Sequence, residues 1–130
     1  MLSSSKNKKI KVNVLDDARR NVKQHVKSYQ KYKDMIRLIK QTNEDTDRYN
    51  GVIRWYNAIR YVLNEWMEFC PWEAEIISET FALGQIKTPI TVNASAMKHH
   101  VSTTTVYDMQ KQFIGDVMAY AGSKNLLKFE

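Results

Sequence analysis

Residues 91–120 read TVNASAMKHHVSTTTVYDMQKQFIGDVMAY, and the interpretation of the fold depends on this stretch. Thr91 or Asn93 can cap a short first helix, and a tight turn follows that helix. Ser102 is a good N-cap for a longer second helix that runs to about Tyr120. Two helices joined in this way have the layout of a helix-turn-helix, in which the second helix presents its N-terminal residues to the major groove of DNA.

The longer helix has an apolar face and a polar face at helical spacing. The inward positions are predicted to be Val106, Met109 or Gln110, Phe113 and Val117, while Val101 and Met97 are predicted to join the two helices. The outward positions are Thr103, Thr104, Tyr107, Asp108 and Lys111. These side chains can contact thymine methyls, base edges or phosphates, and an aspartate can accept from cytosine N4. The competing interpretation is a helical hairpin whose polar face only contacts water.

Charge is distributed unevenly along the 130 residues, whose net charge is +6. Residues 1–42 hold 12 Lys and Arg against three Asp, whereas residues 43–130 hold eight against 11 Asp and Glu. The N-terminal third is therefore expected to face a polyanion, unless it is a solvated basic face without a specific ligand. Residues 1–12 lack apolar spacing and are predicted to be a flexible basic arm. The arm is expected to bind DNA through its lysines Lys6, Lys8, Lys9 and Lys11.

Two long amphipathic helices are predicted before the turn. The first starts after an N-cap at Asn13 and has a stripe at steps of three and four. Its members are Leu15, Ala18, Val22, His25, Tyr29, Tyr32, Ile36 and Ile39. The second stripe follows a short acidic connector and runs from Val52 to Phe69 or Cys70. The two helices are predicted to form an antiparallel hairpin over residues 13–70, with a coiled coil of two copies as the alternative.

The composition favours helices throughout, since the chain holds only four Gly and two Pro. Pro71 is predicted to start a further helix and Gly84 to end it. Residues 85–92 are β-branched but lack a partner strand, so an extended loop is expected. The predicted fold is all-α with five helices. The hairpin is followed by a helix-turn-helix region over 71–122 and a tail over 123–130.

The sequence offers no site typical of an enzyme or of a metal protein. His99 and His100 point about 100° apart on a helix and have no acidic partner at suitable spacing, so we expect them at the surface or against phosphate. His25, Cys70 and the three tryptophans are expected to be packing residues. No P-loop, dinucleotide fingerprint or paired acids appear, and no apolar run reaches the roughly 18 residues of a membrane span. We expect a cytoplasmic protein that is no enzyme, holds no cofactor or metal and does not contact a membrane.

Three blocks of the chain resemble the ArpU family of phage and prophage transcriptional regulators, and more distantly the RinA-type late-gene activators. The blocks are ARRNVKQHVKSYQKYKDMIRLI (18–39), GVIRWYNAIRYVLNEW (51–66) continuing into EAEIISETF (73–81), and VSTTTVYDMQKQFIGDVMAYAG (101–122). The third block is similar to the C-terminal helix-turn-helix of the family, which itself resembles the promoter-reading fourth region of sigma factors. The resemblance implies a regulator that binds double-stranded DNA.

The resemblance places the turn serine at Ser102 and the DNA-reading positions on the five outward residues of the longer helix. Lys98 and His99, just before the turn, are predicted as further DNA contacts. Relatives usually carry several Lys or Arg on the reading helix, where this chain has few. We therefore expect the N-terminal arm, a second subunit in a homodimer or RNA polymerase to contribute to binding.

A second class of phage protein combines the same parts. Small terminase subunits join a helix-turn-helix to oligomerising helices, but they act in DNA packaging and form large rings. They usually carry the motif near the N-terminus, whereas it is C-terminal here, which favours a regulator that is a monomer or a dimer. A helical interaction module without DNA binding is the third interpretation.

Overall fold

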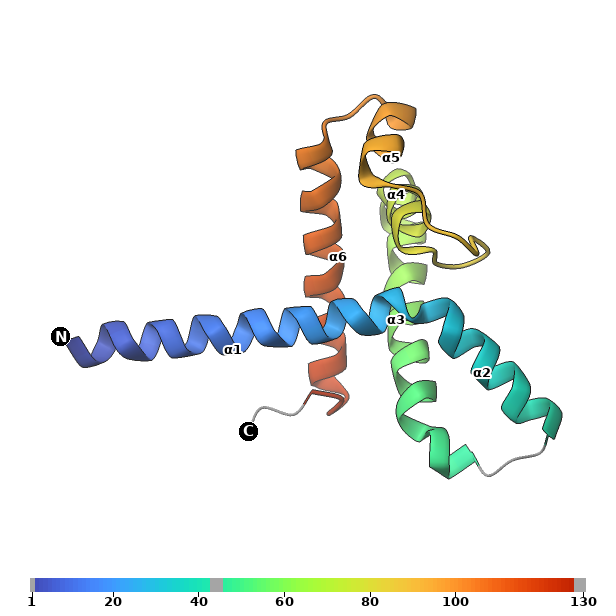
Figure 1. Ribbon diagram of the computed structural model, residues 1–130, viewed down its shortest axis with the longest axis horizontal. Coiled ribbons are helices and arrows are strands. Elements are labelled where there is room, and N and C mark those ends of the chain that lie inside the picture. The colour runs from blue at the N-terminus through green and yellow to red at the C-terminus, as the bar shows by residue number, and fades with distance from the viewer. Residues whose placement is uncertain (1, 43–45, 128–130) are drawn as a thin grey trace.

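The computed structural model describes residues 2–42 and 46–127. Within these residues the protein is entirely helical, without a strand, and the all-α prediction is confirmed. The α-helices are α1 (Leu2–Lys27), α2 (Tyr29–Thr42), α3 (Asn50–Phe69), α4 (Pro71–Phe81), α5 (Val92–His99) and α6 (Thr103–Ser123), and a 3-10 turn (Thr46–Tyr49) precedes α3 (Figure 1). No helix in this part of the chain is long and apolar enough to cross a membrane.

The first helix differs from the prediction at both ends. α1 begins at Leu2, so the helix start predicted after Asn13 was wrong, and residues 2–12 continue the helical backbone. Lysine is a good helix former, and extending an existing helix costs less than starting a new one. The helix also ends earlier than predicted, because it is interrupted by a turn at Ser28, which separates α1 from α2. The Ser28 hydroxyl donates to the Gln24 carbonyl at 2.8 Å, a bond that bends helices.

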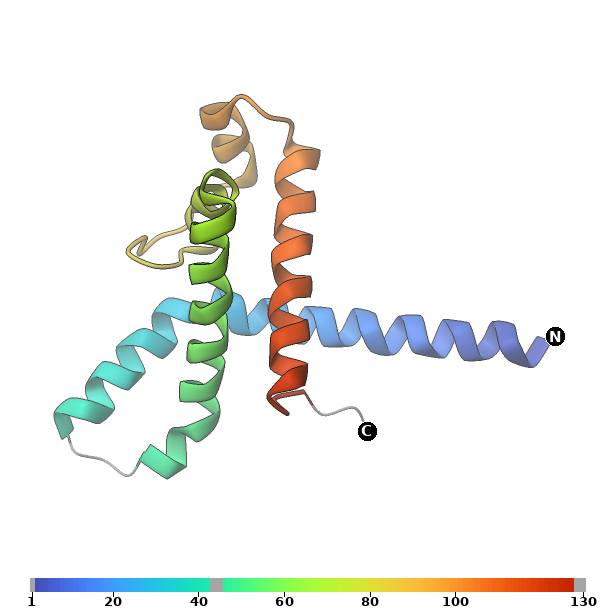
Figure 2. The same ribbon diagram turned by 180° about the vertical axis from the view of Figure 1, so that it is seen from behind.

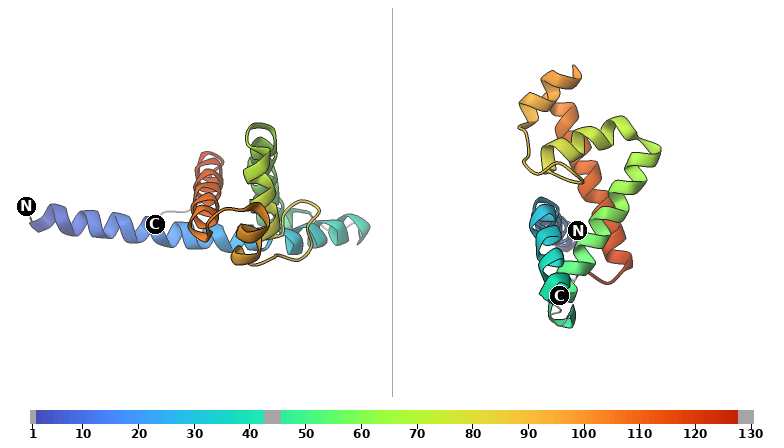
Figure 3. Two further views of the ribbon diagram at one scale, coloured as in Figure 1. Left: turned by 90° about the horizontal axis from the view of Figure 1, so that it is seen from above. Right: turned by 90° about the vertical axis from the view of Figure 1, so that its right-hand side faces the viewer.

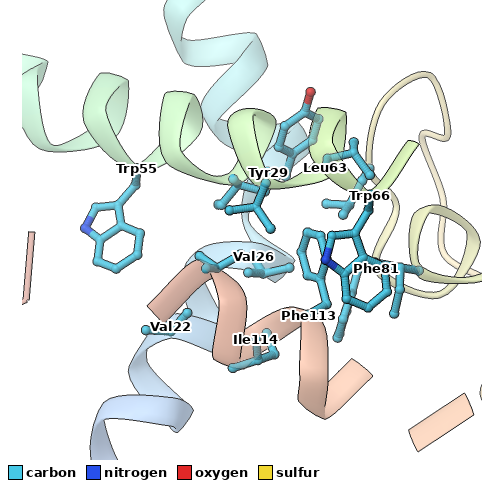
Figure 4. Packing of buried hydrophobic residues seen from close by; sticks show 14 of the residues in the cluster. Val22, Val26, Tyr29, Trp55, Leu63, Trp66, Phe81, Phe113 and Ile114 are labelled. Carbon is cyan, nitrogen blue, oxygen red and sulfur yellow. The ribbon is translucent and has the colours of Figure 1, made fainter. Parts of the chain in front are cut away.

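The break gives the two halves of the predicted long helix different partners. α2 packs beside α3, whereas α1 crosses α6 (Figures 1 and 2). Of the predicted long helix only α2 therefore runs beside α3, whereas α1 reaches α3 near its end through His25. Val22 and Val26 of α1 are fully buried and lie beside Ile114 of α6 (Figure 4). The inward face of α1 thus includes Val26, which the predicted stripe did not contain.

The core centres on Phe113 of α6, which is fully buried. Its ring contacts the Trp66 ring edge-to-face, with centroids 5.3 Å apart, and lies 6.4 Å from the Phe81 ring. Trp55 and Trp66 are buried as predicted, but Trp72 is 43% exposed, so its assignment to the core was wrong. Trp72 lies in the first turn of α4, and its ring meets the His99 ring of α5 edge-on, with centroids 6.4 Å apart.

His25 has the packing role that the sequence predicts. Its ring stacks on Trp55 with centroids 3.9 Å apart, and its Nδ1 lies 2.6 Å from the Tyr32 hydroxyl. Burial lowers the pKa of His25 below its ordinary value. The residue therefore ties α1 to α2 across the break at Ser28.

The predicted start of α4 at Pro71 is confirmed, with Pro71 as its first residue. The helix ends before Gly84, however, because Ala82 already adopts the left-handed conformation at φ 56°. The chain then runs to α5 without helix or strand, as expected. The Gln30 side chain of α2 donates toward the carbonyls of this loop, namely Ala82, Gly84 and Ile86 at 3.1, 3.1 and 2.8 Å. α2 therefore fixes the path of the loop.

α4, α5 and the first half of α6 pack against one another at one end of the molecule (Figure 3, right). A small core of Ile76, Ala96 and Val106 joins them, and each of these residues comes from a different helix. This unit holds the N-terminal half of α6 against two supporting helices.

Candidate nucleic-acid interface

The two helix starts around the turn are capped as the sequence predicts. The Thr91 hydroxyl accepts a hydrogen bond from the Ala94 amide at 3.1 Å and caps α5. The Ser102 hydroxyl accepts from the Thr105 amide at 3.1 Å and caps α6. His100 takes the left-handed conformation at φ 56°, which reverses the chain between the helices. The start of α6 is therefore fixed by its own local chemistry.

The faces of α6 also agree with the prediction. Its exposed residues include all five predicted outward positions, Thr103, Thr104, Tyr107, Asp108 and Lys111. Val106, Gln110, Phe113 and Val117 are buried. Val101 packs against the Ile76 cluster, but Met97 is 78% exposed, so its predicted contact with α6 was wrong. The Val101 amide bonds to the Ala96 carbonyl at 3.0 Å, and this turn leaves Met97 on the outer side of α5.

A groove with cationic walls runs between α1 and α6. It consists of two adjoining hollows of about 560 and 190 Å³, which share Lys23, Phe81, Tyr107 and Gln110. The cations that line it are Arg19, Arg20, Lys23, Lys27, Lys87 and Lys111. No Asp or Glu lines either hollow. We call this feature the basic groove.

The basic groove supplies the charge that α6 itself lacks. Only Lys111 of its six cations belongs to α6, whereas four come from α1 and one from the loop before α5. The sequence shows that α1 is basic, but the contact between α1 and α6 joins residues far apart in the chain. No local signal could have found it. The side chains of Lys6, Lys8, Lys9 and Lys11, predicted to bind DNA, lie outside those that the structure describes.

Lys98 and His99 are engaged with the protein itself. Lys98 forms an ion pair with Glu79 Oε1, and His99 Nε2 lies 3.0 Å from Glu79 Oε2. The Ser95 hydroxyl donates to Glu79 Oε2 at 3.3 Å. The His99 side chain is 9% exposed, so the expected surface position, without an acidic partner, was wrong. The acidic partner of His99 is Glu79 of α4, which lies 20 residues earlier in the chain. A buried carboxylate such as Glu79 needs hydrogen-bonding or charged partners.

The Glu79 cluster fastens α5 to α4. Burial would raise the pKa of Glu79, but the hydrogen bonds from Lys98 and His99 outweigh this effect and hold the pKa below its ordinary value. Glu75, Glu79 and His99 also bring ligand atoms within 4.8 Å of one another, the spacing of a metal site. The Lys98 ammonium already pairs with Glu79, so the arrangement supports a structural ion pair.

Glu79→Gln is expected to lower the free energy of unfolding at pH 7 by about 1–3 kcal/mol, because Lys98 and His99 lose a charged acceptor. The pKa of Glu79 is lowered from 4.5 in the folded protein, so the unfolded chain takes up the proton first. The stability that Glu79 contributes is present above about pH 4.5 and is lost as the pH falls through the folded-state pKa. Urea unfolding at pH 7 and pH 3 measures this.

The difference in stability between the variant and the wild-type protein should therefore narrow as the pH falls below 4.5. Asp17→Asn is the control, because the Asp17–Arg20 pair spans 3.6 Å with both side chains more than three-quarters exposed. It should leave the stability unchanged. An equal loss at both pH values for Glu79→Gln would show that charge does not matter at this position.

Comparison with protein-family models, with curated proteins and with solved structures gives no match for this chain. The geometry of α6 and the basic groove therefore carries the functional argument.

Proposed function

We propose that this protein is a DNA-binding transcriptional regulator of the phage type, in which α5 and α6 act as a helix-turn-helix on promoter DNA. One observation carries the proposal: the basic groove lies directly beside the exposed N-terminal half of α6. Tyr107 and Lys111 line both the groove and the outer face of the helix. A helix that reads bases needs phosphate contacts beside it, and the groove supplies them.

In this proposal α6 contacts the bases and α1 contacts the phosphates, as their side chains suggest. The outward residues of α6 contact base edges in the major groove, with Thr103 and Thr104 nearest the start of the helix. α4 and α5 hold α6 from behind through the Ile76 cluster. The cations of α1 neutralise phosphates on the flanking backbone, a contribution that does not depend on sequence. Asp108 excludes sequences that bring a phosphate or a carbonyl oxygen to its position.

The resemblance of residues 18–39 and 101–122 to the ArpU family supports the same division. The first of these blocks contains the α1 cations, and the second contains the turn and α6. The resemblance implies RNA polymerase as a further partner, since promoter recognition by these regulators serves transcription.

Thr104→Ala, Tyr107→Ala and Lys111→Ala are expected to reduce specific DNA binding by about 1–3 kcal/mol each, or roughly 5- to 150-fold. All three side chains are exposed, so melting temperatures should hardly change. A site is first selected from random duplex DNA with the wild-type protein, with and without RNA polymerase. Binding of each variant to the selected site and to a scrambled site is then measured.

Gln112→Ala is the matched control, because Gln112 is exposed on α6 but does not line the basic groove. It should leave both affinities unchanged. A residue that contacts bases loses affinity for the selected site alone, whereas a purely electrostatic contact weakens both sites equally. Unchanged binding to both sites in all three variants would rule out α6 as the reading helix.

A further inference from the structure

A second hollow lies on the side of α6 away from the basic groove. It is formed by the end of α3, the start of α4 and the middle of α6, and has a volume of about 320 Å³. Its charged residues are Glu65, Glu73 and Asp116, and no Lys or Arg lines it. Asp116 is nine residues after Tyr107, which places the two about 180° apart around the helix. We call this hollow the acidic pocket.

The carboxylates of the acidic pocket lack cationic partners. Within residues 15–42 and 47–127 none of them forms an ion pair. Asp116 Oδ2 accepts a hydrogen bond from Trp66 Nε1 at 2.8 Å, a neutral donor. Burial raises the pKa of the neighbouring Cys70 thiol, and the charges of Glu73 and Asp116 raise it further. The site therefore favours a positively charged occupant.

An exposed aromatic ring lines one side of the acidic pocket. The Phe69 side chain is 78% exposed at the end of α3, and Met67 is 56% exposed nearby in the chain. An exposed ring of this size beside carboxylates without an ion pair is typical of a surface that another chain covers. An occupant that fits must combine positive charge with apolar side chains.

The N-terminal segment of α1 has this composition. Residues 2–14 carry four lysines, no acidic residue and the apolar Ile10, Val12 and Val14. The backbone of this segment is helical and projects past α6, with no other helix beside it in Figures 1 and 2 or in the left view of Figure 3. An isolated helix of this length is only marginally stable in water. A surface that packs against it would stabilise it.

We propose that residues 2–14 of one copy dock in the acidic pocket of a second copy. The positive charge of the four lysines complements the three carboxylates of the pocket, and the apolar residues of the segment complement the exposed Phe69 ring. α1 lies along one side of the molecule and the α3–α4 junction lies on the other (Figure 3, left). Because the two contact surfaces are on different faces of one copy, association is head-to-tail, and copies add in a ring or in an open chain according to the rotation between them.

The proposal is tested without DNA by sedimentation velocity of the full chain over a range of concentrations at low and high salt. The wild-type protein should associate at low salt and dissociate at high salt. Glu65→Lys with Glu73→Lys blocks the pocket, and Lys→Gln at positions 6, 8, 9 and 11 blocks the segment. Each variant alone should associate at least tenfold more weakly than the wild-type protein.

A mixture of the two blocked variants gives the sharpest result. It retains one intact segment and one intact pocket, so it should form a dimer of twice 15.3 kDa and nothing larger. Asp34→Lys with Glu68→Lys is the charge-matched control, because both residues are exposed and neither lines the pocket, and it should associate like the wild-type protein. Melting curves confirm that each variant is folded.

Two results would overturn the proposal. One is a wild-type protein that stays monomeric at low salt, in which case the pocket serves a basic segment of a different protein or none. The other is a blocked-variant mixture that stays monomeric or grows beyond a dimer. DNA binding is measured separately, so failure of this contact leaves the proposed reading helix untouched.

Discussion

Phe113→Ala is expected to lower the free energy of unfolding by about 3–5 kcal/mol, because removing the ring leaves a cavity that its neighbours cannot fill. Phe113 is fully buried and contacts Trp66 of α3 and Phe81 of α4. The substitution therefore weakens three helices at once. Since domains of this size are stable by only about 5–15 kcal/mol, the loss is a large fraction of the total.

Urea unfolding followed by far-UV circular dichroism and by tryptophan fluorescence measures this loss. Phe113→Leu retains most of the volume and should cost much less, which keeps the test informative if the alanine variant fails to fold. Phe69→Ala is the matched control, because the same truncation is made where the ring is 78% exposed. Equal losses at the two phenylalanines would contradict the central position of Phe113 in the core.

Features fixed within one turn of the chain could be predicted from the sequence. Thr91 and Ser102 cap helices with hydroxyls that bond to amides three residues ahead, and Pro71 starts a helix because of its fixed φ. The outward face of α6 follows from its helical period alone. The sequence alone therefore predicted correctly that the five candidate reading positions of α6 are exposed.

Features that depend on tertiary partners could not be predicted. The period of α1 does not show that Val26 meets α6, nor that the helix bends where Ser28 bonds back to Gln24. The position of His99 depends on Glu79, a residue of another helix. In each case the competing positions look equivalent in sequence, and the difference in free energy arises only when the helices pack.

The basic groove could not be predicted from the sequence, and it leads to a prediction about the salt dependence of DNA binding. Gln substitutions at Arg19, Arg20 and Lys23 are expected to flatten the salt dependence of DNA binding. Each phosphate contact contributes about −0.9 to the slope of log K against log salt concentration. Loss of three contacts should therefore reduce the slope by about three, and at low salt the affinity should fall by several orders of magnitude for any sequence. Fluorescence anisotropy with a labelled duplex, measured between 50 and 300 mM salt, gives the slope.

The control must change net charge by the same amount elsewhere. Gln substitutions at Lys31, Arg37 and Lys40 do this, because all three side chains are exposed on α2 and none lines the basic groove. A bound duplex feels these distant charges only weakly, since salt screens them beyond about 10 Å at 0.1 M. If both triple variants flatten the slope equally, net charge rather than the basic groove attracts the DNA. If only the α1 variant does so while retaining its preference for the selected site, α1 supplies phosphate contacts and α6 supplies the reading of bases.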